Sequence, residues 1–125
     1  MNVQDLKDRL NLLLEKCLIK QKEYDIATIA FERLLKMLNK HDIEQAEMLF
    51  THLPMALSRI EKGEEVEKPA VELMKEVKNS NYFPLAKEHV FFIENKWGAP
   101  LPEGEKEFLY MHYTNVINLN SQGGQ

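Results

Sequence analysis

Apolar residues recur at intervals of three and four along almost the whole chain, and no stretch alternates with a period of two. This spacing places apolar side chains on one face of an α-helix. The fold class predicted is therefore all-α, a bundle of five to six antiparallel helices. The apolar patterns predict helices over residues 3–19, about 24–38, 43–60, 69–77, 84–97 and 102–118.

Several residues mark the expected helix ends. Gly63 and Gly98 follow apolar runs, where glycine commonly ends a helix. Asp42 precedes the third run and is a suitable N-cap. Pro54 lies inside the third run, where its ring removes a backbone hydrogen bond and is expected to bend or split the helix.

The length and composition indicate one soluble domain. A chain of 125 residues with 44% hydrophobic and 29% charged residues can bury a core without disulfides or metals. We expect a single helical domain over 1–120 and a disordered tail over 121–125. The sole cysteine, Cys17, excludes an internal disulfide and lies in a leucine-rich pattern, which predicts a buried structural role. No apolar run approaches the roughly 20 residues that span a bilayer, and a cytoplasmic location is expected.

The charge distribution argues against direct binding to nucleic acid. The net charge is −4 and the sequence pI is about 5.6. Binding to phosphate backbones depends on clustered lysine and arginine, whereas the basic residues here are interspersed with acidic ones. That pattern is typical of solvated helix faces.

Four histidines are the main candidates for chemistry. His41 lies in a polar break and is expected to be an exposed loop residue, and His89 is flanked by charges and expected to be half-exposed. His52 and His112 are embedded among apolar and aromatic residues. Each is either a packed core residue or a placed chemical group, and position alone leaves both alternatives open.

Helical spacing gives these two histidines polar neighbours. Seven residues return to within roughly 20° of the starting direction, two turns on. Arg59 follows His52 by seven residues, Glu105 precedes His112 by seven, and Asn115 follows it by three. Such neighbours can hold an imidazole in one tautomer or contact an anion on it. A neutral histidine keeps a lone pair that can attack phosphorus.

Other chemistries lack their motifs. No histidine pair has the spacing of a helical metal site, and no histidine has glutamate three residues before it. No nucleophile–base motif and no glycine-rich phosphate loop is present. We therefore expect no metal, no cofactor and no enzymatic activity.

The surroundings of the two histidines resemble those of the PTS regulation domain, the helical module of antiterminators and activators controlled by the sugar phosphotransferase system. The resemblance covers about residues 43–118, and its second motif is the more specific. The first motif comprises His52-Leu53, Ala56-Leu57, Arg59-Ile60 and Gly63. The second comprises Trp97-Gly98, Leu101-Pro102-Glu103, Glu105, Phe108-Leu109, Met111-His112 and Asn115.

The resemblance implies regulation by phosphorylation. In that family the two histidines, matched here by His52 and His112, accept phosphate from HPr or from an EIIB component of a sugar transporter. Arg59 is the implied partner for phosphate on His52, with Glu105 and Asn115 as supporting residues. The added charge alters dimer packing in the family, so a homodimer is expected. The family commonly has aspartate before the first histidine, where this chain has Thr51.

Other functions stay open at this stage. The chain carries one such module without a nucleic-acid-binding domain, so a stand-alone member acting on a partner regulator is expected. The alternative is a helical interaction subunit that is not phosphorylated and whose histidines are only packed. A histidine phosphotransfer domain of two-component signalling is disfavoured, because neither histidine is followed by the Lys-Gly pair of those domains.

Overall fold

The chain folds into six helices and no strand within residues 1–64 and 68–122, the part that a computed structural model describes. This confirms the predicted all-α fold class. The expected tail residues 123–125, and residues 65–67 of the expected connector, lie outside the described part. The helices are α1 (Val3–Glu15), α2 (Gln21–Leu38), α3 (Glu47–Glu61), α4 (Val71–Asn79), α5 (Phe83–Trp97) and α6 (Glu103–Gln122).

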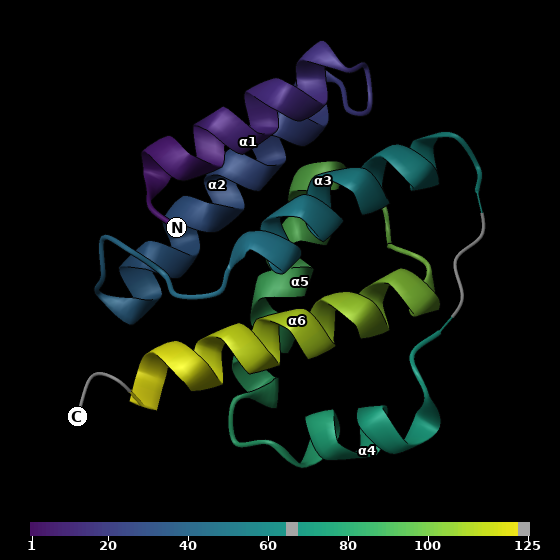
Figure 1. The fold of residues 1–125 in the computed structure, drawn as a ribbon. Coiled ribbons are helices and arrows are strands. Elements are labelled where there is room, and N and C mark those ends of the chain that lie inside the picture. Colours follow the sequence, from purple (N-terminus) through teal and green to yellow (C-terminus); the bar gives the residue numbers. More distant parts are fainter. Residues whose placement is uncertain (65–67, 123–125) are drawn as a thin grey trace.

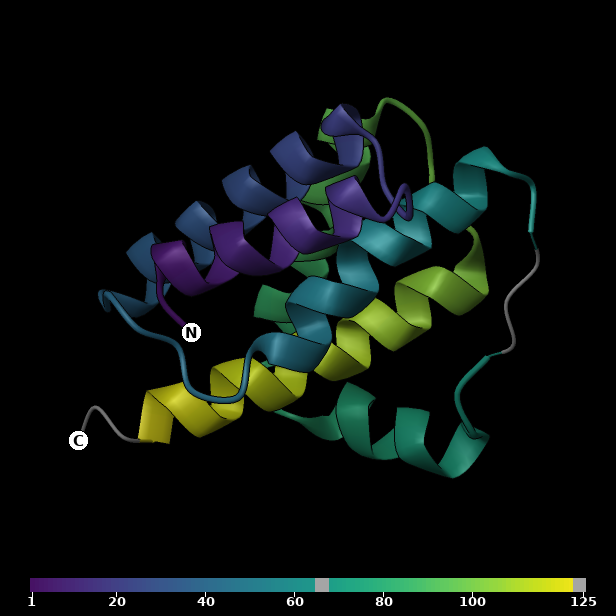
Figure 2. The same cartoon turned by 45° about the horizontal axis from the view of Figure 1, so that its top comes forward.

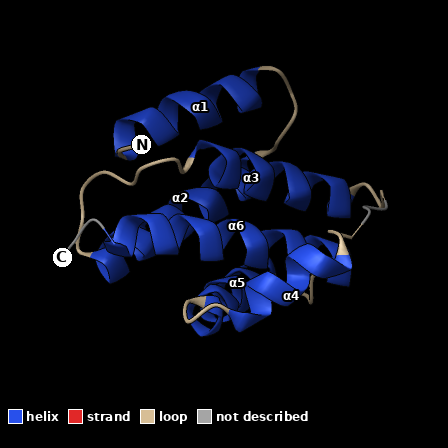
Figure 3. Cartoon of the chain, turned by 60° about the horizontal axis from the view of Figure 1, so that its bottom comes forward, coloured by secondary structure: helices blue, strands red, loops and turns tan. Residues whose placement is uncertain are grey.

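The helices form a bundle in which α2, α3, α5 and α6 surround a common core (Figure 1). α1 runs antiparallel to α2 and also contacts α3, while α4 packs on α5 and α6 (Figure 2). α1 and α4 therefore lie on opposite sides of the molecule (Figure 3). α3 and α6 run in opposite directions against one another, and this pair carries both histidine motifs.

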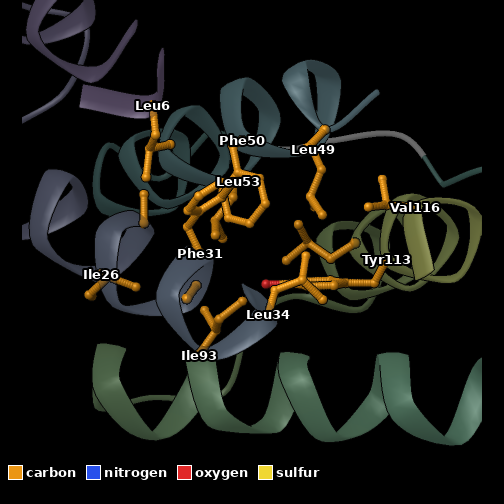
Figure 4. Packing of buried hydrophobic residues seen from close by; sticks show 14 of the residues in the cluster. Leu6, Ile26, Phe31, Leu34, Leu49, Phe50, Leu53, Ile93, Tyr113 and Val116 are labelled. Carbon is orange, nitrogen blue, oxygen red and sulfur yellow. The ribbon is translucent and has the colours of Figure 1, made fainter. Parts of the chain in front are cut away.

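Aromatic rings at the centre join three of the four core helices, α2, α3 and α6 (Figure 4). Phe31 of α2 meets Phe50 of α3 edge to face with ring centroids 4.9 Å apart. Phe50 in turn makes an edge contact with Tyr113 of α6, at 6.5 Å. All three side chains are fully buried or nearly so. Edge-to-face pairs fix the relative rotation of the helices that carry them, so this cluster sets how α3 faces α6.

Local signals account for most helix ends. Asn2 and Asp5 form a reciprocal capping box at the start of α1. Gly63 (φ 74°) and Gly98 (φ 95°) adopt left-handed conformations just after α3 and α5, as the sequence predicted. Pro54 was expected to bend or split α3; the helix continues through it from Glu47 to Glu61 and is not split.

The start of α3 differs from the prediction. Asp42 does not cap it: the helix begins at Glu47, and the Asp42 carboxylate lies 3.1 Å from the Met1 amino group. Gln45 has φ 53°, which interrupts a helix. The side chain of Asn120 on α6 accepts a hydrogen bond of 2.8 Å from the Glu44 backbone N–H and donates one of 3.0 Å to the Glu44 carbonyl oxygen. Tertiary contacts therefore stabilise a loop where the apolar pattern continues.

The end of α1 also corrects an expectation. The helix stops at Glu15, and Cys17 adopts φ 60° in the following turn. Hydrogen bonds from Cys17 N to Leu14 O and from Leu18 N to Leu13 O close that turn, the pattern of a Schellman motif. Cys17 is exposed, so its predicted burial is wrong.

Other helix boundaries lie within a few residues of those expected. α4 begins at Val71 rather than at Pro69. α6 continues to Gln122, two residues into the stretch expected to be a tail.

Candidate functional site

The two embedded histidines meet where α3 packs against α6. The ring centroids of His52 and His112 are 5.2 Å apart, and the rings are inclined at 45°. Phe108, one turn before His112, lies 5.6 Å from the His52 ring. The two histidines of the family motifs therefore approach one another across the packed helices α3 and α6.

A carboxylate and a guanidinium complete the junction. The Glu105 side chain on α6 is only 1% exposed, and its carboxylate lies 3.3 and 3.4 Å from Nη2 of Arg59 on α3. Glu105 Oε1 also lies 3.6 Å from Nε2 of His52. The sequence placed Glu105 beside His112 along one helix, but its close contacts are with the residues of α3.

The electrostatics of Glu105 follow from these contacts. Burial alone opposes its ionisation, but the contact with His52 and the charge of Arg59 outweigh burial, so the pKa of Glu105 lies below its ordinary value. The carboxylate is therefore ionised at neutral pH, and the positive charge of Arg59 compensates it.

His112 has the opposite environment. Burial, with a smaller contribution from neighbouring His52, lowers the pKa of His112 to about 4. Its imidazole is consequently neutral at the pH of a cell, and one ring nitrogen retains a lone pair.

Both histidines line an open surface pocket of about 450 Å³, which we call the histidine pocket. The His52 side chain is 20% exposed there, and Arg59 is 28% exposed. Asn115, the remaining predicted site residue, is exposed on α6 and is not among the pocket residues. The pocket is lined by Arg9, Glu47, Met48, Thr51, His52, Met55, Arg59 and His112.

Arg9 is a pocket residue that the sequence did not reveal. Its Nη1 donates a hydrogen bond of 2.7 Å to Thr51 Oγ1, which brings α1 to the residue next to His52. Arg9 is one of many charged residues in the polar half of α1. No local pattern distinguishes it, because its position depends on how α1 packs against α3.

The other two histidines lie elsewhere. His41 is exposed in the loop after α2, as predicted. The prediction for His89 is wrong: it is 3% exposed, and its ring stacks on Tyr113 at 5.0 Å with an interplanar angle of 4°. Burial, with a smaller effect from Arg33, lowers the pKa of His89 to about 4. The flanking charges suggested a solvated face, but α5 is covered on that side by α6.

The histidine pocket thus places two imidazole rings beside guanidinium groups that can donate hydrogen bonds. A neutral ring can attack an electrophilic phosphorus, and guanidinium groups bind phosphoryl oxygens well. Within the described residues, no group of three or more His, Cys, Asp and Glu side chains is arranged to hold a metal ion. No helix in the described ranges has the length and apolar character needed to cross a membrane.

Comparison with known protein families agrees with the resemblance that the residues around the two histidines indicated. A sequence model of the PRD domain matches residues 25–116, from the first turns of α2 into the last turns of α6, and both histidines fall within it. Comparisons with curated proteins and with solved structures found no match to this chain. The family match covers well over half of the sequence and confirms the resemblance to the PTS regulation domain. The chain therefore belongs to the PRD domain family.

Proposed function

We propose that this protein is a regulatory phosphoacceptor of the bacterial sugar phosphotransferase system, phosphorylated on histidine by HPr or an EIIB component. The observation that carries the proposal is the 5.2 Å approach of His52 and His112 in a pocket that also contains Arg59. Family membership supplies the class of donor. The protein acts as an acceptor and signal carrier in this scheme and catalyses no reaction of its own.

His52 has a defined reactive nitrogen under this proposal. Its Nε2 is buried and faces Glu105, which leaves Nδ1 as the nucleophile. The Nδ1 lone pair forms the new bond to phosphorus, while the bond from phosphorus to the donor atom breaks and its electron pair stays with the donor. The accepting ring becomes positively charged with its proton on Nε2, and the Glu105 carboxylate stabilises that charge.

His112 is the second acceptor and carries the more specific family motif. Its pKa of about 4 keeps its ring neutral, so no proton has to leave before attack. The two rings lie so close that phosphate on one adds nearly two negative charges beside the other. We therefore expect the first phosphorylation to hinder the second.

Phosphorylation has a direct consequence for the α3–α6 contact. A phosphoryl group on His52 competes with Glu105 for Arg59, because phosphate carries more charge than a carboxylate. Glu105 is 1% exposed, so losing Arg59 leaves this buried anion with only the His52 ring beside it. The two helices are then expected to shift, and this shift carries the signal to dimer or partner contacts.

The partners that we propose are proteins. HPr or EIIB delivers the phosphoryl group, a second copy of this chain forms a homodimer, and a partner regulator receives the output. Nucleic acid is disfavoured by the net charge of −4.

Phosphotransfer in vitro tests the proposal. The protein is incubated with phosphoenolpyruvate, Enzyme I, HPr and candidate EIIB components, and acid-labile phosphate is mapped by mass spectrometry. We expect label on wild type, reduced by His52→Ala or His112→Ala and abolished by the double variant. His41→Ala is the matched control, since His41 is exposed and does not line the pocket.

An unlabelled wild type, or label that survives in the double variant, contradicts the proposal and favours the alternative of a helical interaction subunit. Sedimentation velocity before and after labelling then tests the homodimer, with a change in mass expected on phosphorylation.

A further inference from the structure

Helix α1 is an addition to the family segment that reaches into the histidine pocket. The family match begins at residue 25, whereas α1 spans Val3–Glu15. α1 packs on α2 and α3 through Leu6, Leu10 and Leu13. Beside this apolar face, Arg9 extends to Thr51 and forms part of the pocket wall.

The charge of Arg9 is not neutralised by its partner. The Thr51 hydroxyl accepts the hydrogen bond without carrying a charge. Among the described residues, no carboxylate lies within ion-pair distance of Arg9. An aspartate at position 51 would pair with Arg9 and cancel its charge, so the threonine keeps a full positive charge at the pocket.

The other charged groups of the pocket do not reverse this balance. Arg59 is shared with buried Glu105, which lies behind the histidines. Glu47 lines the pocket, but its side chain is 47% exposed and lies 4.0 Å from the Met1 amino group. Solvent and that amino group screen its charge. The pocket wall therefore presents, beside two imidazoles, a guanidinium that has no ion-pair partner among the described residues.

We infer that Arg9 binds the oxygens of a phosphoryl group in the histidine pocket, so that α1 completes a phosphate site outside the family segment. The Thr51 bond uses one N–H of the guanidinium and fixes its plane, and the remaining N–H groups can contact phosphoryl oxygens. Arg59 also lines this pocket. This inference rests on the proposed function, because it assigns a residue to the same phosphoryl group.

A titration with inorganic phosphate tests Arg9 without any phosphotransfer. The side-chain NMR signals of the His52 and His112 rings are followed in wild type, Arg9→Gln and Arg9→Lys. We expect saturable shifts of both rings in wild type. The phosphate Kd should rise at least about tenfold in Arg9→Gln, since it loses a charge-assisted hydrogen bond, and less in Arg9→Lys, which keeps the charge.

Lys7→Gln is the matched control, because it removes the same charge from an exposed position of α1 that does not line the histidine pocket. Its phosphate Kd should equal that of wild type. Circular dichroism melting of each variant shows that the helices remain intact.

Each outcome is decisive for one of the two proposals. No saturable shift in wild type, or equal Kd values for wild type and Arg9→Gln, overturns the role of Arg9. Equal losses of phosphate affinity in Arg9→Gln and Lys7→Gln also overturn it, because the effect then comes from the net charge of the protein and not from a contact with Arg9. Failure of phosphotransfer to wild type contradicts the proposed function alone, because the phosphate titration does not depend on a donor protein.

Discussion

His89 shows how far a single residue can depart from its sequence context. It is flanked by Glu88 and lies two residues after Lys87, yet it is 3% exposed and stacks flat on Tyr113. No hydrogen-bond partner is present for its Nδ1 within the described residues. A protonated ring at this position would place an uncompensated charge in the core, which the lowered pKa of about 4 reflects.

Stability should therefore fall in mild acid. Between pH 6.5 and 4 the unfolded chain binds a proton at His89 that the folded protein does not, so the free energy of unfolding rises with pH through that window and levels off above it. We expect the lowered pKa of His89 alone to make the free energy of unfolding about 2 kcal/mol smaller at pH 5 than at pH 8. Urea unfolding at both values measures this.

The variants separate His89 from other acid effects. His89→Phe preserves a stacked ring and should reduce the pH 8 to pH 5 difference by that amount, whereas His41→Gln, at an exposed position, should leave it unchanged. His112 has a pKa that is also lowered to about 4, so His89→Phe should retain part of the pH dependence. Identical pH profiles for wild type and His89→Phe would show that His89 ionises freely.

At the scale of elements, the contact between α3 and α6 includes a buried ion pair beside its apolar packing. Arg59 and Glu105 join the two helices at 3.3 Å, with Glu105 almost wholly buried. A second ion pair on α3, Lys20–Glu61 at 2.8 Å, is exposed at 73% and 38%. The two pairs have similar chemistry and differ in burial, so they form a natural comparison.

Removing the cation from each pair should give unequal effects. Arg59→Met leaves the Glu105 charge buried and unpaired, and should lower the free energy of unfolding by about 3 kcal/mol. Lys20→Met breaks a solvated pair and should change the free energy of unfolding far less than Arg59→Met does. Urea denaturation at pH 7 measures both.

The double variant Arg59→Met/Glu105→Leu should recover most of the loss, because no unpaired charge then remains in the interface. Equal costs for Arg59→Met and Lys20→Met would mean that water reaches Glu105 in the folded protein.

At the scale of the whole molecule, α1 extends the core that the family segment forms. Leu6 and Leu10 are fully buried, and Leu13 is 9% exposed, all against helices of the matched segment. The segment without α1 would expose the apolar surfaces that these leucines cover on α2 and α3.

A fragment of residues 21–122 should accordingly be much less stable than the full chain. Burial of three leucines contributes roughly 5 kcal/mol by apolar area, a large share of the stability of a small domain. Urea unfolding followed by circular dichroism should show an earlier and broader transition. Leu12→Ala in the full chain is the control, since Leu12 is 50% exposed and should change the midpoint little. A fragment as stable as the full chain would show that α1 is only loosely attached.

The sequence by itself determined the fold class and most of the elements. Apolar spacing of three and four requires helices that bury one face, and the glycines at 63 and 98 ended helices because few other residues adopt positive φ easily. The motif surroundings were also sufficient to indicate the family, since those residue types recur at the spacing of its two histidine motifs.

Only the tertiary structure decided which residues share the histidine pocket. Arg9 and Thr51 are 42 residues apart and meet through the packing of α1 on α3, which no local pattern encodes. The start of α3 and the burial of His89 likewise depend on contacts with α6. Periodicity reports which side of a helix is apolar, but the partner of each side chain depends on how the helices cross. The sequence thus indicated the two histidines, Arg59 and Glu105, whereas the place of Arg9 beside them came only from the packing of α1.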